Sequence, residues 1–342
     1  MRSGLSIATA GLLAMAGAAW AAEPAPRALD VHADISGAWS NASATQLQRP
    51  AGVPLKLTEA QARAFADANP MVRAFTGRGE PTNPADGAPR VDDVASTPGN
   101  AFWLDPGTSA GRVRGEYRSS WIVEPTDGRL PLTQAGLARA REAPAITNRQ
   151  DPSGPEDLAP NDRCLIASRG SGGPGMLNNI YNSNYLIVQT PGAVVIVVEM
   201  IHDARIIPIF PGKAAAQAGH QPAALASWLG DPVGWWDGDT LVVETTNVAL
   251  QQGRFGPIFL SPQGRVTERL TRASPAEIDY AFQVEDAVYY TQPWRAEMTL
   301  NALKEPIYEY ACHEGNYAME GILQGARVRE AKGLPLDQAN DE

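Results

Sequence analysis

The sequence predicts a mainly β protein, a β-rich α+β fold in which an antiparallel meander closes as a barrel or a strongly curved sandwich. The chain of 342 residues contains 32 Gly and 28 Pro, and turn residues at this frequency favour many short strands over long helices. Strand patterns crowd together from Cys164 onward. Such a sheet has to close or stack in order to hide its edges, and only two short peripheral helices are expected beside it.

The first residues predict export. Arg2 gives a positive start, residues 5–19 are uncharged and small or apolar, and Ala19-Trp20-Ala21 forms an A-x-A pattern. These are the n-region, h-region and cleavage site of a signal peptide at residues 1–21. The apolar run is shorter than the about twenty residues of a membrane span, although an uncleaved anchor is the alternative. We expect cleavage after Ala21, a periplasmic or secreted protein, and no membrane insertion afterwards.

The mature chain is expected to form one domain at residues 34–330, between a flexible N-terminus at 22–33 and a disordered tail at 331–342. Thr58 is the expected N-cap of a first helix, which Pro70 ends. The N-terminal part, residues 34–160, should contain strands at 34–40 and 119–124, helices at 57–69 and 133–142, and polar loops at 70–115 and 148–161.

An antiparallel β core is expected at residues 161–327. Thr190-Pro191-Gly192 and Asp237-Gly238 lie between strand patterns and predict hairpins. Apolar and polar residues alternate at 278–285, which is typical of a half-buried strand. The expected strands span residues 185–189, 193–200, 205–210, 235–236, 240–244, 266–271, 278–285, 294–300 and 307–312.

Charge and cysteine content limit the partners. The chain has 28 Lys and Arg against 38 Asp and Glu, a net charge of −10, so it repels phosphate backbones and is not expected to bind nucleic acid. Cys164 and Cys312 are the only two cysteines. In an exported protein we expect them to form a disulfide, with two buried free thiols as the alternative. The sequence leaves the oligomeric state open.

The first polar cluster follows the glycine-rich residues 170–175. Its amides and phenols could hydrogen-bond a neutral polar ligand, or they could satisfy the backbone of their own loop. No phosphate-binding motif accompanies the glycines. The candidate ligand-binding residues here are Asn178, Tyr181, Asn182 and Tyr185.

The second cluster, Glu199-Met200-Ile201-His202-Asp203-Ala204-Arg205, directly follows an apolar strand pattern. A turn or bulge at residues 202–204 would bring its polar side chains together. Histidine gains or loses a proton near neutral pH, so His202 with Glu199 and Arg205 forms a candidate acid–base set. A structural ion pair at a hairpin end is the alternative.

Two further clusters complete the candidates. Residues 312–317 place His313, Glu314, Asn316 and Tyr317 just after an expected strand, and Glu244 lies near the end of another. Neither His202 nor His313 belongs to a spaced metal-ligand motif. We therefore predict no metal, with a site built from these histidines and Glu199 or Glu314 as the alternative. The lack of a nucleotide-binding motif predicts no cofactor.

These clusters carry a family resemblance. The segments at 181–191, 199–205, 238–247 and 293–294, and above all Tyr308-Glu309-Tyr310-Ala311-Cys312-His313-Glu314-Gly315-Asn316-Tyr317, resemble a large family of exported bacterial proteins whose activity is uncharacterised. The resemblance covers residues 160–327 well and the N-terminal Gly37-x-Trp39 more loosely. It implies a secreted β-rich fold and supplies no activity.

Two functions are carried forward. The first is an exported, cofactor-free enzyme that acts on a small polar or aromatic molecule by hydrolase, lyase or isomerase chemistry. His202 and His313 would transfer protons, Glu199 and Glu314 would orient them or act as bases, and Arg205 would stabilise negative charge. The second is a lipocalin-like binding protein without catalysis, whose aromatic residues line an apolar pocket.

Overall fold

The computed structural model describes residues 26–28, 32–69, 72, 105–147, 152, 154–167, 170–249 and 257–334. The expected signal peptide, most of the segment at 22–33, most of the loop at 70–115 and residues 335–342 of the expected tail lie outside these ranges. No helix within the described ranges has the length and apolar character of a membrane span.

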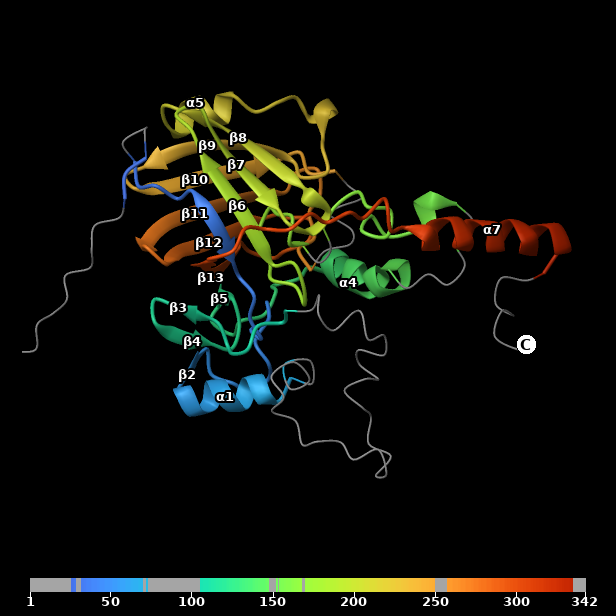
Figure 1. The fold of residues 1–342 in the computed structure, drawn as a ribbon, viewed down its shortest axis with the longest axis horizontal. Helices are drawn as coiled ribbons and strands as arrows, with labels where there is room; N and C mark the ends of the chain where they lie inside the picture. The colour runs from blue at the N-terminus through green and yellow to red at the C-terminus, as the bar shows by residue number, and fades with distance from the viewer. Residues whose placement is uncertain are drawn as a thin grey trace, which may run out of the picture.

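Nine strands close into a barrel, so the barrel is the correct one of the two predicted architectures. The ring closes where Trp39 and Ser40 of the first strand pair with Ala302 and Asn301 of the last. A tenth strand, β5 (Ile122–Glu124), pairs with the last barrel strand beside this closure. Around the barrel the order is β1 (Gly37–Ser40), β6 (Asn184–Gln189), β7 (Ala193–Val198), β8 (Ala204–Phe210), β9 (Asp231–Asp237), β10 (Thr240–Thr246), β11 (Arg265–Ser274), β12 (Glu277–Glu285) and β13 (Trp294–Ala302) (Figure 1).

One part of the predicted meander is wrong, because β8 and β9 run parallel. Parallel neighbours need a crossover of about a dozen residues or more. Residues 211–230 supply it, with the short helix α5 (Lys213–Ala218) and the 3-10 turn η6 (Ala223–Leu225). The β9–β10 hairpin forms as expected, but Asp237 pairs with Thr240, so its turn lies one residue later than predicted.

Apart from β1 and β5, which belong to the barrel sheet, the N-terminal part forms a small annex under the barrel (Figure 1). Helix α1 (Glu59–Asp67) has Thr58 as its N-cap, as predicted, and Gln61 completes a capping box. Helix α4 (Gln134–Thr147) is longer than the helix expected at 133–142. The sequence did not predict the three-stranded sheet β2 (Lys56–Leu57), β4 (Glu116–Arg118) and β3 (Arg112–Val113).

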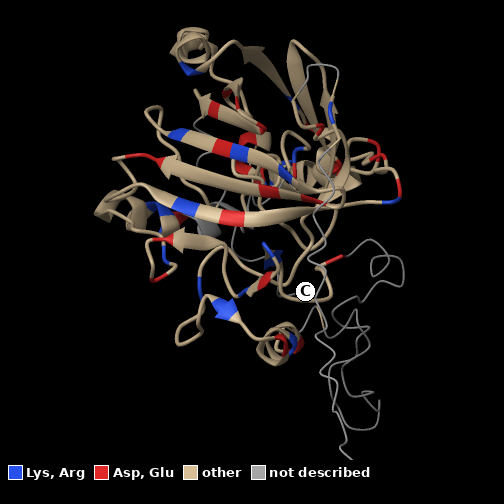
Figure 2. Ribbon diagram, turned by 90° about the vertical axis from the view of Figure 1, so that its left-hand side faces the viewer, with Lys and Arg blue, Asp and Glu red and all other residues tan. Residues whose placement is uncertain are grey.

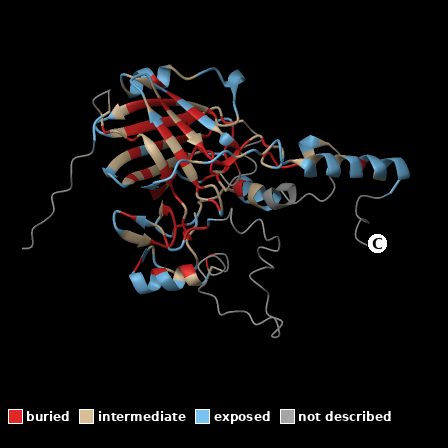
Figure 3. Cartoon of the chain, in the orientation of Figure 1, coloured by how far each residue is buried: buried red, intermediate tan, exposed pale blue. Residues whose placement is uncertain are grey.

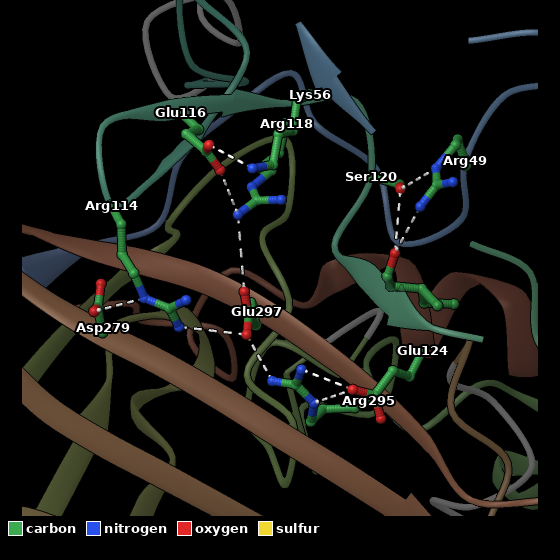
Figure 4. Close-up of polar contacts among 11 residues, drawn as sticks. Arg49, Lys56, Arg114, Glu116, Arg118, Ser120, Glu124, Asp279, Arg295 and Glu297 are labelled. Carbon is green, nitrogen blue, oxygen red and sulfur yellow. Dashed lines mark hydrogen bonds and ion pairs between the residues drawn. The ribbon is translucent and has the colours of Figure 1, made fainter. Parts of the chain in front are cut away.

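Ion pairs around Glu297 of β13 hold this annex to the barrel (Figure 4). From the annex, Arg114 lies 3.3 Å from both Glu297 and Asp279, and Arg118 lies 3.9 Å from Glu297. Arg295, on the same strand as Glu297, lies 2.6 Å from it. Although burial opposes ionisation, Arg295 and Arg114 hold the pKa of Glu297 below its usual range. Figure 2 shows further acidic and basic residues on the barrel strands. Arg269 of β11 and Asp237 of β9 form one such pair at 2.9 Å.

The strand predicted at 307–312 is wrong. Residues 303–316, here called the strap, contain no strand and cross the outside of the barrel (Figure 1). The backbone edge of β13 that another strand could join is already paired with β1, so residues 307–312 cannot add a strand there. Leu303 N donates to Ala38 O at 2.8 Å where the strap begins. The strap leads into α7 (Tyr317–Lys332), a helix absent from the prediction, so more than two helices surround the barrel.

The lumen is filled. The side chains of Trp39, Tyr185, Tyr280, Phe282 and Trp294 are at most 1% exposed there, and the buried positions concentrate in the barrel strands (Figure 3). A glycine-rich loop, residues 170–177, here called the plug, contacts side chains of the lumen. Gly175 N donates to Glu268 Oε1 at 3.3 Å, and Met176 N donates to the Tyr280 hydroxyl at 2.9 Å.

The plug is rich in glycine because its backbone passes close to lumen side chains. A Cβ on Gly173 would lie 2.7 Å from Arg205 Nη1, and one on Gly175 would lie 2.7 Å from Ile258 Cδ1. Both glycines have positive φ angles, which other residues adopt only with strain.

Candidate functional site

A cavity of about 350 Å³ lies beyond the paired residues Ser40 and Asn184, where β1 ends and β6 begins. Two segments far apart in the chain form most of its wall, residues 43–47 and 177–180. None of the lining side chains that the structure describes is titratable. The lining residues are Ser43, Ala44, Thr45, Gln46, Leu47, Asn69, Pro106, Leu177, Asn178, Asn179, Ile180 and Pro257.

Asn178 fixes the shape of this cavity. Its Oδ1 accepts a hydrogen bond from Trp121 Nε1 at 2.7 Å, and its Nδ2 donates to Ser43 O at 2.8 Å and Thr45 O at 3.2 Å. Both amide hydrogens and one acceptor site therefore serve the protein itself. Asn178 lines the cavity, as the ligand-binding prediction requires, but its main contacts tie the two wall segments together. The Gln46 side chain is exposed on the same wall.

The structure separates the other residues of the first cluster. Tyr185 is fully buried in the lumen, where its hydroxyl donates to Ser171 O of the plug at 3.1 Å. Tyr181 forms a hydrogen bond with Tyr310 of the strap, and burial raises the pKa of Tyr310 to about 12. Asn182 faces Glu199. The four candidate ligand residues thus belong to three different environments.

Glu199 anchors the strap. It is 4% exposed, and its carboxylate accepts hydrogen bonds from Asn182 Nδ2 at 2.6 Å, Asn184 Nδ2 at 3.1 Å and Tyr308 N at 3.2 Å. Three donors from three different residues thus converge on one carboxylate. Glu199 therefore joins the start of β6 to the strap.

His202 holds the strap from the same side. A single 3-10 turn, η5 (Met200–His202), gives Ile201 and His202 positive φ angles of 62° and 47°. This turn aims His202 Nδ1 at Tyr310 O, 3.1 Å away. A carbonyl oxygen only accepts, so Nδ1 carries the proton in this contact. The imidazole is otherwise exposed.

Asp203 belongs to the same turn, and the sequence analysis gave it no separate role. Its Oδ2 accepts a hydrogen bond from Ala167 N at 2.7 Å. A Cβ on Gly172 of the plug would lie 3.1 Å from this oxygen. Burial raises the pKa of Asp203 to about 6, against smaller opposite effects from the Ala167 hydrogen bond and His202. Asp203 is thus a titratable group between the plug and the strap anchor.

Arg205 lies inside the barrel, away from the other members of the predicted acid–base set. It is 1% exposed and pairs with Glu268, to which Nη1 donates at 3.0 Å. Sequence reasoning missed Glu268. The sequence did contain an indication of its burial, because Glu268 lies on the apolar face of the strand, between Val266 and Leu270.

Glu244 lies on the outer face of β10, under the crossover segment, together with a histidine that the prediction missed. His220 Nε2 is 3.3 Å from Glu244 Oε1, and His220 Nδ1 is 2.7 Å from Asp231 Oδ2. Gln217 Nε2 donates to both oxygens of Glu244. Across the described ranges, no group of three or more His, Cys, Asp or Glu is arranged to hold a metal ion.

The last cluster lies where the strap meets α7. Cys164 and Cys312 form the predicted disulfide, with an S–S distance of 2.04 Å. Asn316 caps α7 and donates to Asp162 O at 2.8 Å. The neighbouring side chains of His313, Glu314 and Tyr317 are exposed. Among the described residues, no hydrogen bond or ion pair joins His202 to His313 or to Glu314.

Comparison with known proteins adds no assignment: no protein family, curated sequence or solved structure matches the chain. The family resemblance of the strap motif stays a prediction. Glu199, His202 and Asn182 come together at the strap, whereas Arg205, Glu244 and the exposed residues of the last cluster lie in other environments.

Proposed function

We propose that the protein binds a small uncharged molecule, without catalysis, in the cavity between residues 43–47 and 177–180. The observation that supports this proposal is the uncharged, mixed apolar and amide composition of the lining residues that the structure describes, none of which is titratable. A charged ligand would lose its hydration there without gaining a partner charge. The volume of about 350 Å³ is near the lower end of the range for small-molecule sites.

The wall chemistry favours a ligand with an apolar body and a few polar groups. Leu47, Leu177, Ile180 and two prolines provide apolar contacts, and the Gln46 amide can donate or accept. A hydroxylated ring or a small amide has this composition. A lipocalin-like protein would bind its ligand in the lumen of the barrel. The proposed site lies instead beyond the ends of the strands.

The exported-enzyme hypothesis stays a prediction, and the geometry gives it less support. Glu199 and Arg205 are used in internal contacts, and His202 Nδ1 is bound to a backbone carbonyl. Acid–base catalysis needs such groups within hydrogen-bonding reach of one substrate.

Ligand-observed NMR with neutral sugars, hydroxylated aromatics and small amides, each paired with a carboxylate analogue, tests the binding proposal. We expect at least one neutral compound to bind and its charged analogue to bind at least about tenfold more weakly. Gln46→Trp should block the cavity, whereas Gln263→Trp on an exposed turn serves as the matched control. The proposal fails if no compound binds or if Gln46→Trp binds as well as the control.

The same mixtures also test the enzyme hypothesis. If the wild-type protein converts a compound and His202→Ala or His313→Ala abolishes the conversion, catalysis replaces binding as the function. Full activity in both variants would exclude the proposed histidine roles.

A further inference from the structure

Helix α7 has a solvent-exposed face that carries the large apolar side chains of Tyr317 and Val328. It extends from the end of the strap beyond the barrel (Figure 1), and most of its length is exposed (Figure 3). Tyr317 is 80% exposed and Val328 is 51% exposed, whereas Ala326 on the opposite side is the one buried residue of the helix. Half of the helix circumference therefore has no covering within the described chain.

Two glycines lie on this exposed face. A Cβ on Gly321 or Gly325 would meet nothing within 4 Å, and both have ordinary helical backbones. Glycine inside a helix costs about 0.5–1 kcal/mol relative to alanine. Packing within the chain does not require these glycines, but close approach of another helix would.

The exposed face of α7 is complementary to the same face of a second copy when the two helices run antiparallel. Tyr317, Gly321, Val328 and Lys332 lie on one stripe, because their spacings of four, seven and four residues follow the helical repeat. When two copies of the helix run antiparallel about the midpoint of this stripe, Val328 of each faces Gly321 of the other. Tyr317 of each then faces Lys332, which suits a cation–π contact.

Charge also favours a second copy. The first half of α7 carries Glu320, and the second half carries Arg327, Arg329 and Lys332 with one acid, Glu330. Glu320 and Arg327 lie on the same flank of the stripe, seven residues apart. Antiparallel pairing brings Glu320 of one helix to Arg327 of the other, twice in a symmetric contact. Parallel pairing would instead bring like charges together.

We propose that α7 is a dimerisation helix that packs antiparallel against α7 of a second copy of this chain. A helix of 16 residues is about 24 Å long, so the contact is smaller than a standard interface of about 800 Å² per partner. The dimer is therefore weak and depends on concentration. Arg327 keeps its pair with Glu330 and gains a second carboxylate.

Sedimentation of the full mature chain over a range of concentrations tests the proposal. We expect a monomer–dimer equilibrium that Val328→Asp abolishes and that Val288→Asp, an exposed valine on the barrel, leaves unchanged. Glu320→Lys should weaken the dimer about tenfold, since the change occurs twice in the contact. Circular dichroism checks that each variant keeps its helix.

The charge-swapped variant Glu320→Lys/Arg327→Glu decides between a second copy and another partner. It should dimerise again, because each lysine faces a glutamate of the other chain. A monomer at every concentration would overturn the proposal. The proposal would also be overturned if the charge-swapped variant dimerised no more tightly than Glu320→Lys. Equal effects of Val328→Asp and Val288→Asp on dimerisation would overturn it as well.

Discussion

Arg205 and Glu268 face each other in the centre of the closed barrel, with both side chains at most 1% exposed. The guanidinium donates through Nη1 and Nη2 to the two carboxylate oxygens, and Tyr280 donates to the same carboxylate at 2.5 Å. Burial opposes the charged form of Arg205, but Glu268 raises its pKa above the ordinary value. The barrel core therefore contains a charged pair surrounded by aromatic side chains.

Removing one member of this pair should be strongly destabilising. Glu268→Gln leaves the Arg205 charge buried without its carboxylate, and a broken buried pair typically costs about 3–5 kcal/mol. Urea unfolding of the protein measures the loss. A loss below about 1 kcal/mol would mean that the pair is not charged or not buried in solution.

The double variant Arg205→Met/Glu268→Leu should lose less stability than Glu268→Gln alone. Replacing both partners removes the buried charge together with its desolvation cost, and such exchanges are often near neutral. Additive losses in the double-mutant cycle would contradict the coupling.

The raised pKa of Asp203 predicts an unusual pH dependence of the free energy of unfolding. Its folded pKa of about 6 lies above the unfolded value of about 3.9, so the folded state binds this proton more tightly. The Asp203 contribution therefore becomes less favourable as pH rises from about 4 to about 6, by up to about 3 kcal/mol.

Asp203→Asn should remove this dependence. The amide oxygen can still accept from Ala167 N, but no buried charge forms above pH 6. The variant should be more stable than the wild type at pH 7 and similar to it at pH 4, as measured by urea unfolding at each pH. Glu309→Gln on the exposed side of the strap is the control. Parallel pH profiles of wild type and Asp203→Asn would contradict the prediction.

Local patterns predicted much of the barrel. The alternation of apolar and polar residues at 278–285 corresponds to β12 (Glu277–Glu285), because one face of that strand is buried and the other is partly exposed. The strap shows the limit of such patterns. Its residues have strand propensity, but propensity does not reveal that β1 and β13 have already closed the ring. The parallel β8–β9 pair was missed for a similar reason, since pairing across residues 211–230 leaves no local signature.

The candidate site was harder to predict than the fold. The cavity wall consists of two segments that lie far apart in the sequence, around residues 43 and 178. The Asn178 hydrogen bonds between these segments form only in the folded protein. The second cluster was found by sequence, but positive φ angles at Ile201 and His202 redirect the chain between Glu199 and Arg205. The resulting positions, Glu199 under the strap and Arg205 in the lumen, could not be read from residue spacing.

The disulfide should contribute strongly to stability. Cys164 and Cys312 are separated by 148 residues, and the loop-entropy model gives about 5 kcal/mol for closing a loop of that length. Cys164→Ser/Cys312→Ser should lower the free energy of unfolding by up to this amount, as measured by urea unfolding. The reduced wild type should match the variant. A loss below about 1 kcal/mol would show that the strap detaches separately from the barrel.

The plug should tolerate no side chain at Gly173. This residue has a φ of 85°, and a Cβ there would lie 2.7 Å from Arg205 Nη1, so Gly173→Ala adds backbone strain and pushes against the buried ion pair. We expect a loss of at least about 2 kcal/mol in the free energy of unfolding. Gly192→Ala is the matched control, because nothing lies within 4 Å of its Cβ position, and it should stay within about 0.5 kcal/mol of the wild type. Equal stability of the two variants would mean that the plug does not occupy the lumen in solution.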